Sequence, residues 1–245
     1  MKNNKINILG VHFDAVTTNE ATKKTLGFLN DDKKRMIFTA NPEIVMEATK
    51  NRDFLHIINK GDLTVADGIG VVIGAKIIKH PLPERVAGYD LVQNIFENIK
   101  NTNKTAYFFG ASPGVAKKAA KKMMSLHKGL KIIGIHDGYF DQEEEKKIRF
   151  EINQLKPDLL LIGLGAPRQE KWIFENIEML DVKVCIGIGG SFDVMSGEVK
   201  RAPKIFIKLG LEWFYRLITQ PTRFKRMMKL PIFLLEVVKH RKEYI

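Results

Sequence analysis

The sequence predicts an α/β protein with a mostly parallel sheet, helices on both faces of that sheet, and a helical C-terminal appendage. Strand-like and helix-like segments alternate through most of the chain. Several of the strands, such as residues 105–109 and 158–163, are continuous apolar runs. Strands of this kind belong to parallel sheets that are covered on both sides. After Gly197 only helical patterns follow, so we expect one α/β catalytic domain over residues 1–195 and an appendage over 196–245.

The strand predictions are set by short apolar stretches that end in polar or glycine-rich turns. They cover residues 6–10, 11–16, 35–40, 63–66, 105–109, 131–135, 158–163 and 182–188. The predicted helices lie between them, over residues 18–30, 43–50, 52–60, the run after Gly68, a segment ending near 100, the lysine-rich run after Gly114, residues 141–156 and the segment after Pro167. Thr18 and Asp141 suit the helix starts, and Pro42 suits the first position of a helix.

Composition limits the classes of protein that need to be considered. Of the 245 residues 44% are hydrophobic and 28% charged, which is typical of a globular chain. The one cysteine, Cys185, lies in an apolar run, so no disulfide can form within the chain and a reducing compartment is expected. No apolar run reaches the ~18 residues of a spanning helix, and the first residues do not resemble a signal peptide. We expect a cytoplasmic protein, or one peripheral to a membrane.

The positive charge is concentrated at the C-terminal end. The formal net charge is +12, and residues 200–245 contain twelve Lys or Arg against three acidic residues. A segment of this kind attracts an anionic partner, which could be a phospholipid surface, a phosphorylated substrate or nucleic acid. Nucleic acid is the least favoured of these, because the cations alternate with large aliphatic residues rather than forming a polar face.

Polar residues and glycines follow most of the predicted strands. Because parallel strands end at the same edge of a sheet, these residues are expected to converge there. The set suits a nucleotide with a phosphorylated sugar better than a metal ion, because no His/Cys cluster has ligand spacing. Asp137 and Asp193 could equally be turn residues, and Asn41 could be only a helix cap. The set comprises Thr39, Asn41, Asp67, Gly110, Asp137, Tyr139, Gly165, Gln169 and Asp193.

Asp67 is the leading candidate for a reacting group. It directly follows the buried strand Leu63–Ala66 and precedes the glycine-rich turn GIGVVIG. That turn resembles a dinucleotide-binding fingerprint, but the required second strand with its terminal acid does not follow. Two prolines and a loop, HPLPERVAGYD, stand there instead. Nicotinamide-cofactor binding is therefore disfavoured, and no cofactor is expected.

If the substrate is a nucleotide-sugar, the charge that develops on the leaving diphosphate must be neutralised. The chain has no Asp-x-Asp motif, the usual metal-binding signature of such enzymes, so no metal site is expected and arginines are the alternative. Arginine binds phosphate with planar, bidentate geometry. The candidates are Arg85 and, in the appendage, Arg216, Arg223 and Arg226. The appendage arginines could equally lie on a solvated face or contact lipid headgroups.

The appendage also has an apolar pattern. Ile205, Leu209, Trp213 and Leu217 recur every four residues, bordered by Lys204, Lys208 and Arg216. This predicts an amphipathic helix that lies on an anionic membrane surface. The alternative is a helix packed on the core or on another subunit, so a homo-oligomer stays open.

Motifs spread over nearly the whole chain resemble those of the WecG/TagA/CpsF glycosyltransferases (glycosyltransferase family 26), most closely its TagA branch. The motifs are TANPEIV at 39–45, ADGIGVV at 66–72, RVAGYDL at 85–91, FFGASPG at 108–114, LLIGLGAPRQEKW at 160–172, GIGGSFDVMSGEVKRAP at 187–203, GLEWFYRL from 210 and PTRFKR ending at 226.

This resemblance implies a Rossmann-like domain and a metal-independent, inverting transfer of N-acetylmannosamine. The donor would be its UDP derivative and the acceptor C4 of GlcNAc on undecaprenyl diphosphate, in the synthesis of the wall teichoic acid linkage unit. Asp67 would be the general base and Arg85 would hold phosphate. Sugars would be positioned by Thr39, Asn41 and Gln169, and the nucleotide pocket formed by Gly110, Tyr139 and Asp193. The appendage, docked at the inner face of the cell membrane, would close over the diphosphates with Arg216, Arg223 and Arg226.

Two alternatives stay open at the level of sequence. One is a member of the same family with another donor, such as UDP-N-acetylmannosaminuronic acid or UDP-glucose. The other is a membrane-surface scaffold whose site no longer catalyses a reaction.

Overall fold

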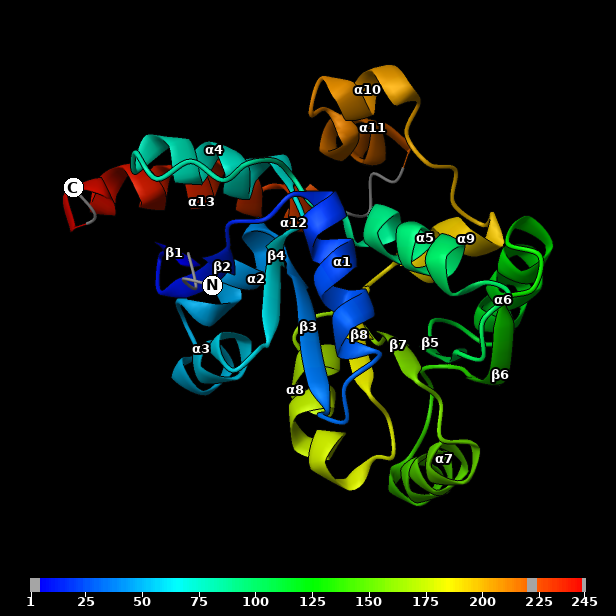
Figure 1. Ribbon diagram of the computed structural model, residues 1–245. Coiled ribbons are helices and arrows are strands. Elements are labelled where there is room, and N and C mark those ends of the chain that lie inside the picture. Colours follow the sequence, from blue (N-terminus) through cyan, green and yellow to red (C-terminus); the bar gives the residue numbers. More distant parts are fainter. Residues whose placement is uncertain (1–4, 220–223, 244–245) are drawn as a thin grey trace.

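The computed structural model describes residues 5–219 and 224–243, and its centre is a six-stranded sheet (Figure 1). The strand order is β4-β3-β8-β7-β5-β6, and every neighbouring pair is parallel. The predicted parallel sheet is thus confirmed. Its strands are β3 (Arg35–Ala40), β4 (Leu63–Ala66), β5 (Thr105–Gly110), β6 (Lys131–His136), β7 (Leu159–Gly163) and β8 (Val184–Gly187).

Helices cover both faces of this sheet. On one face lie α2 (Pro42–Ala48), α3 (Arg52–Asn59), α7 (Gln142–Leu155) and α8 (Arg168–Asn176), the last followed by the 3-10 turn η1 (Ile177–Met179). On the other face lie α1 (Thr18–Phe28), α5 (Gly88–Ile99), α6 (Val115–Leu126) and α9 (Ser191–Ser196). This arrangement confirms the prediction of a doubly covered sheet.

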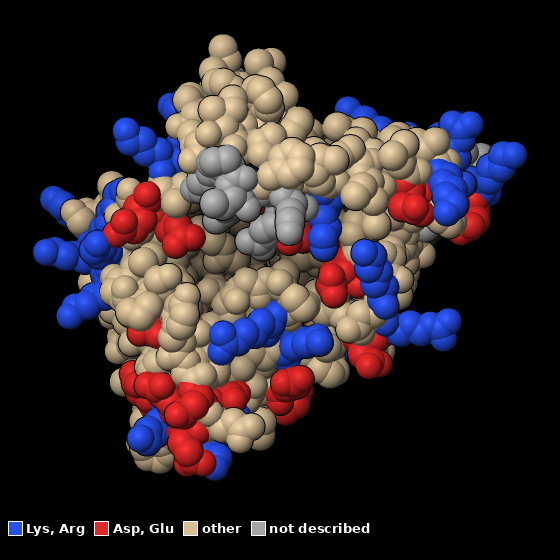
Figure 2. Space-filling view, turned by 180° about the vertical axis from the view of Figure 1, so that it is seen from behind, with Lys and Arg blue, Asp and Glu red and all other residues tan. Residues whose placement is uncertain are grey.

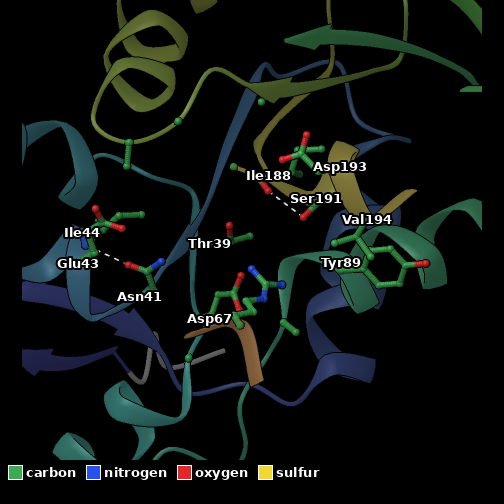
Figure 3. Close-up of a pocket in the computed structure, with 18 of the residues that line it drawn as sticks. Thr39, Asn41, Glu43, Ile44, Asp67, Tyr89, Ile188, Ser191, Asp193 and Val194 are labelled. Atoms are coloured by element: carbon green, nitrogen blue, oxygen red, sulfur yellow. Dashed lines mark hydrogen bonds between the residues drawn. The ribbon is translucent and has the colours of Figure 1, made fainter. Parts of the chain in front are cut away.

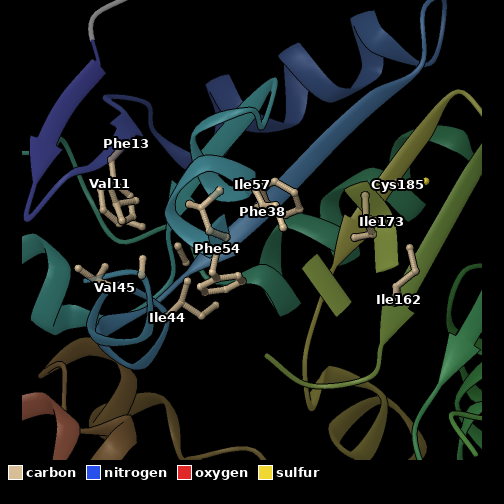
Figure 4. Close-up of a cluster of buried hydrophobic side chains, with 14 of the residues drawn as sticks. Val11, Phe13, Phe38, Ile44, Val45, Phe54, Ile57, Ile162, Ile173 and Cys185 are labelled. Carbon is tan, nitrogen blue, oxygen red and sulfur yellow. The ribbon is translucent and has the colours of Figure 1, made fainter. Parts of the chain in front are cut away.

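The strands alternate between two hydrophobic clusters because successive side chains point to opposite faces. In β7, Leu160 and Ile162 belong to the cluster with α2, α3, α7 and α8, which Figure 4 shows in part. Leu159 and Leu161 belong to the cluster on the other face. Both faces of the strand are buried, which explains why its sequence is a continuous apolar run.

The first two strands stand apart from the main sheet. β1 (Lys5–Ile8) and β2 (Val11–Asp14) form a separate antiparallel hairpin. Its two-residue turn has Leu9 at φ 51° and Gly10 at φ 89°, the left-handed conformation that tight hairpins require. The hairpin is joined to the main sheet by Asp14, whose carboxylate accepts the backbone N–H of Thr64 at 3.0 Å.

The region after residue 196 consists of α10 (Lys204–Lys208), α11 (Glu212–Thr219), α12 (Phe224–Met227), α13 (Lys229–His240) and the turn η3 (Arg241–Glu243). The predicted single amphipathic helix over 205–217 is wrong, because α10 and α11 are separate. Between them Gly210 adopts φ 72°, a left-handed conformation that ends a helix. Gly210 also lies so close to α4 (Ile69–Ile77) that an added Cβ would come within 2.8 Å of Ile69.

The two halves of this region have different surroundings. α13 packs beside α2 and α4 (Figure 1), and its Phe233 and Val237 are fully buried in the hydrophobic cluster of the core. The hairpin of α10 and α11 instead projects from the molecule and exposes Ile205, Leu209 and Ile218. Within the part of the chain described here, no helix is long and apolar enough to cross a membrane.

Candidate active site

A cavity of about 760 Å³ opens at the carboxyl edge of the sheet, between the strand ends and the helices after residue 200. Figure 3 shows Thr39 and Asp67 in the middle of this site, with Asn41 on one side and Asp193 on the other. Seven of the nine residues predicted to converge at this edge line the cavity, whereas Gly110 and Asp137 do not. The residues assigned a role from the sequence that line the cavity are Thr39, Asn41, Asp67, Arg85, Tyr139, Gln169, Asp193 and Arg216.

Asp67 is positioned by the end of β4 and by the loop that precedes α5. Its backbone N–H donates to the carbonyl of Ala40 at 2.9 Å, which fixes it beside the end of β3. Its carboxylate accepts the backbone N–H of Gly88 at 3.2 Å. A Cβ at Gly88 would lie 3.3 Å from this carboxylate and 3.1 Å from the methyl group of Thr39. The close approach of α5 to Asp67 therefore depends on glycine.

Burial raises the pKa of Asp67 above its ordinary value of 3.8. The guanidinium of Arg85, the N–H of Gly88 and the guanidinium of Arg216 oppose this effect, whereas the carboxylate of Glu212 adds to it. A desolvated carboxylate with a raised pKa is a better proton acceptor than one in water. The environment of Asp67 thus suits the predicted general base, although that role itself stays a prediction.

Thr39 and Asn41 both follow β3, and both also serve the fold. The hydroxyl of Thr39 is buried and donates to the carbonyl of Gly187 at 2.8 Å, which joins the ends of β3 and β8. Asn41 caps α2, because its Oδ1 accepts the backbone N–H of Ile44 at 3.1 Å. The cap proposed from sequence is present, and the asparagine also faces the cavity.

Gln169 reaches the cavity from the first turn of α8 and is nearly fully buried. Its amide oxygen accepts the backbone N–H of Gly189 at 3.0 Å, and its amide nitrogen donates to Oε1 of Glu170 at 2.7 Å. Gln169 therefore holds the loop between β8 and α9 in place. Its predicted contact with a sugar would use the second hydrogen of the amide nitrogen.

The three residues proposed for the nucleotide pocket differ in position. Tyr139, which is 68% exposed, and Asp193 both line the cavity. Gly110 does not, because it packs so tightly that an added Cβ would lie 2.4 Å from the carbonyl oxygen of Gly163. Its neighbours Ala111 and Ser112 line the cavity in its place. The glycine thus allows β5 and β7 to end side by side.

Arg85 and Arg216 are brought together by Glu212, a residue for which the sequence suggested no role. Nη2 of Arg85 donates to Oε2 of Glu212 at 3.0 Å, and Nη2 of Arg216 donates to Oε1 at 2.8 Å. Of the other two arginines, Arg223 lies outside the described residues, and so does the side chain of Arg226, whose backbone is part of α12.

Two further arginines line the cavity and were not among the sequence candidates. Arg168 donates to the carbonyl of Gly138 at 3.0 Å and lies over the ring of Phe140. Arg201 forms an ion pair with Asp90 at 2.6 Å and lies over the ring of Tyr89. Arg168 follows the glycine- and proline-containing turn after β7, and that position in the sequence could have indicated it. Arg201 comes after α9, where no strand end marks it.

The cavity therefore combines one desolvated carboxylate with several guanidinium groups. Such a set can accept a proton and neutralise a phosphate-bearing leaving group. In the described part of the chain, no group of three or more His, Cys, Asp or Glu side chains is arranged to hold a metal ion.

Comparison with known proteins gives relatives over most of the chain. An enzyme from Bacillus subtilis (strain 168) is 39% identical over 207 residues, 84% of this chain and 80% of the relative. One from Bacillus spizizenii is 38% identical over 215 residues, 88% of this chain and 83% of the relative. One from Staphylococcus aureus (strain MRSA252) is 34% identical over 241 residues, 98% of this chain and 94% of the relative. Each is named N-acetylglucosaminyldiphosphoundecaprenol N-acetyl-beta-D-mannosaminyltransferase.

A family model supports the same relationship. The model of the glycosyl transferase WecG/TagA/CpsF family matches residues 6–244. This range includes both the cavity and the helices that close it. The chain belongs to the WecG/TagA/CpsF family of glycosyltransferases.

Proposed function

We propose that the protein transfers N-acetylmannosamine from UDP-N-acetylmannosamine to C4 of the GlcNAc on undecaprenyl diphosphate, the step that builds the linkage unit of wall teichoic acid. The names of three relatives at 34–39% identity support the acceptor and the transferred sugar. The observation that supports the chemistry is the cavity itself, where Asp67 lies beside Arg85 and Arg216.

The reaction is a single displacement with inversion. The C4 hydroxyl oxygen of the acceptor attacks the anomeric carbon of the donor sugar, the bond from that carbon to UDP breaks, and UDP leaves with the bonding electrons. Asp67 takes the hydroxyl proton, so that the attacking oxygen gains nucleophilicity as the new bond forms. Thr39, Asn41 and Gln169 position the sugars, and Tyr139, Asp193 and the turn after Gly110 form the nucleotide side of the cavity.

Arginines neutralise the charge that develops on the leaving diphosphate. Arg85 comes from the catalytic core and Arg216 from α11, and both line the cavity. A guanidinium in a partly buried site interacts with phosphate more strongly than it would in water. We propose that these groups, together with Arg223 and Arg226, act in place of a metal ion.

The lipid-linked acceptor gives the hairpin of α10 and α11 a role. Its Ile205, Leu209, Phe214 and Ile218 are exposed apolar residues, and Figure 2 shows this lobe as largely uncharged. Lys and Arg side chains gather to either side of it in the same view. Apolar residues bordered by cations favour the interface of an anionic bilayer. We propose that the protein works peripherally at the inner face of the cell membrane.

Product analysis tests the proposal. The wild-type chain is incubated with a GlcNAc-diphosphate-lipid and, separately, with UDP-N-acetylmannosamine, UDP-N-acetylmannosaminuronic acid and UDP-glucose. The expected product is the β-linked disaccharide lipid from the first donor only. Transfer only from another donor would contradict the proposed substrate, and the absence of any transfer and of any UDP-dependent thermal shift would indicate a scaffold.

A further inference from the structure

Glu212 occupies a central place in the cavity wall that the proposed reaction does not use. It is the first residue of α11 and lines the cavity together with Arg85 and Arg216. Each of its carboxylate oxygens accepts from a different guanidinium, Oε2 from Arg85 at 3.0 Å and Oε1 from Arg216 at 2.8 Å. The contact with Arg85 spans 127 positions in the sequence and joins the core to the region after residue 200.

Glu212 and Arg85 are mostly buried, which separates their contact from an ordinary surface ion pair, while the side chain of Arg216 is 32% exposed. The side chains of Arg85 and Glu212 are only 15% and 13% exposed. Burial alone would raise the pKa of Glu212, but the guanidinium groups of Arg216 and Arg85 outweigh it and hold the pKa below its ordinary value of 4.5. Glu212 is therefore charged at neutral pH, and salt screens it less than an exposed residue.

The geometry leaves much of each guanidinium available for another partner. Among the residues that the structure describes, only one nitrogen of Arg85 and one of Arg216 has a hydrogen-bond partner. Both groups line the same cavity as Asp67. Two cations would repel one another in this space, and the carboxylate between them offsets that repulsion.

We propose that Glu212 is a positioning residue, which holds Arg85 and Arg216 together as a paired clamp for the diphosphate of a substrate. This inference rests on the proposed function, because the proposed donor and acceptor both carry a diphosphate and guanidinium groups bind phosphate oxygens through charge-assisted hydrogen bonds. Glu212 acts through the arginines and does not touch the substrate. A clamp that is assembled before binding loses less conformational entropy when the ligand arrives.

The substitution Glu212→Gln tests this role with little change in shape. Glutamine has only one acceptor oxygen, and its amide nitrogen is a donor, so it cannot bridge two guanidiniums. We expect calorimetric titration with UDP and with inorganic pyrophosphate to show about a tenfold rise in Kd, within the range measured for charge-assisted contacts. With UDP-N-acetylmannosamine and a GlcNAc-diphosphate-lipid, KM should rise more than kcat falls. Glu212→Asp, which keeps both acceptor oxygens, should recover part of the affinity.

A double-mutant cycle shows whether Glu212 acts through its partner. In the Arg216→Ala background, Glu212→Gln should weaken pyrophosphate binding by less than about threefold, because coupled residues are non-additive. The matched control is Glu198→Gln, which removes an exposed ion pair between Glu198 and Lys118 and should leave Kd and KM unchanged. Thermal unfolding of all variants reports any general loss of stability.

Several results would overturn the inference. Unchanged pyrophosphate binding by Glu212→Gln would mean that Glu212 does not position the arginines, and tighter binding would mean that it competes with phosphate for them. Fully additive effects of the Glu212 and Arg216 substitutions would mean that the two residues act independently. If Glu212→Asp bound pyrophosphate no more tightly than Glu212→Gln, a bridging carboxylate would be excluded. If the wild type binds pyrophosphate as expected but transfers no sugar, the proposed function fails while the positioning role stands.

Discussion

The carboxylate of Asp67 accepts the backbone N–H of Gly88 at 3.2 Å, which joins the end of β4 to the first turn of α5. Arg85 lies three residues before this contact, in the loop that the contact anchors. The arrangement sets the protonation behaviour of Asp67. Burial raises its pKa, and the opposing influence of Arg85 is the largest of those that lower it.

The pH dependence of the reaction should reflect this balance. A general base must be unprotonated, so the rate falls as the pH drops through the pKa of Asp67, which lies above its ordinary 3.8. Arg85→Gln removes the cation that most favours the ionised form, and the acid limb of the kcat/KM profile should move to higher pH. The control is Arg201→Gln, since Arg201 pairs with Asp90 instead. A limb that stays in place or moves to lower pH in Arg85→Gln would contradict this account.

Glu170 should make the stability of the protein depend on pH. It is fully buried, its Oε2 has no hydrogen-bond partner among the described residues, and burial raises its pKa to about 7. The protonated form is favoured in the folded state, so its stabilising contribution is present below about 4.5 and is lost as the pH rises through about 7.

Chemical denaturation between pH 5 and pH 8 tests this prediction. The free energy of unfolding of the wild type should fall relative to Glu170→Gln by on the order of 1–3 kcal/mol over that range. Glu175→Gln is the matched control, because Glu175 is an exposed residue of the same helix. Parallel pH curves for the wild type and Glu170→Gln would show that Glu170 does not titrate as described.

α13 should contribute to folding as a core helix does. Phe233 is fully buried and lies against α4, where a Cβ at Gly74 would come within 3.0 Å of its ring. We expect Phe233→Ala to lower the free energy of unfolding by about 3–5 kcal/mol. Leu235→Ala on the same helix, at a position 69% exposed, should change it by less than about 0.5 kcal/mol. Equal effects of the two substitutions would mean that α13 is not packed on the core in solution.

The exposed residues of α10 and α11 should determine membrane binding. Each large aliphatic side chain that enters the bilayer contributes about 1.5–3 kcal/mol, so Leu209→Glu together with Ile218→Glu should weaken binding to anionic vesicles more than tenfold. The control is Leu126→Glu, at a similarly exposed position on α6, which should bind like the wild type. Co-sedimentation with vesicles measures the effect, and normal binding by the double variant would place the docking surface elsewhere.

The sequence was sufficient to predict the alternation of strands and helices and the edge of the sheet where the site lies. Continuous apolar strands and polar strand ends are local signals, and Asp67 follows directly from them. The packing of α13 could not be predicted in the same way. Gly70 and Gly74 resembled part of a nucleotide-binding turn, whereas in the structure they give room to Leu230 and Phe233. That role depends on residues about 160 positions away, which no local pattern reveals.

The role of Glu212 within the site could not be predicted from a local sequence pattern either. In the sequence it is one acid in a strongly basic segment, and its spacing to Arg216 indicates only a pair on one helix. Its second partner, Arg85, comes from a loop of the core. The fold alone brings the two arginines to one carboxylate, so the bridge could not be derived from either segment by itself.

The most direct test of the central claim is a single-turnover measurement with Asp67→Asn, using UDP-N-acetylmannosamine and a GlcNAc-diphosphate-lipid. Asp137→Asn is the matched control, because Asp137 also follows a strand and accepts a backbone N–H, from Tyr139 at 2.9 Å. Asp67→Asn should keep the fold and its affinity for UDP but lose the rate of transfer by roughly 10²-fold or more, while Asp137→Asn stays near the wild type. Transfer by Asp67→Asn at a near-normal rate would contradict the assignment of Asp67 as the base.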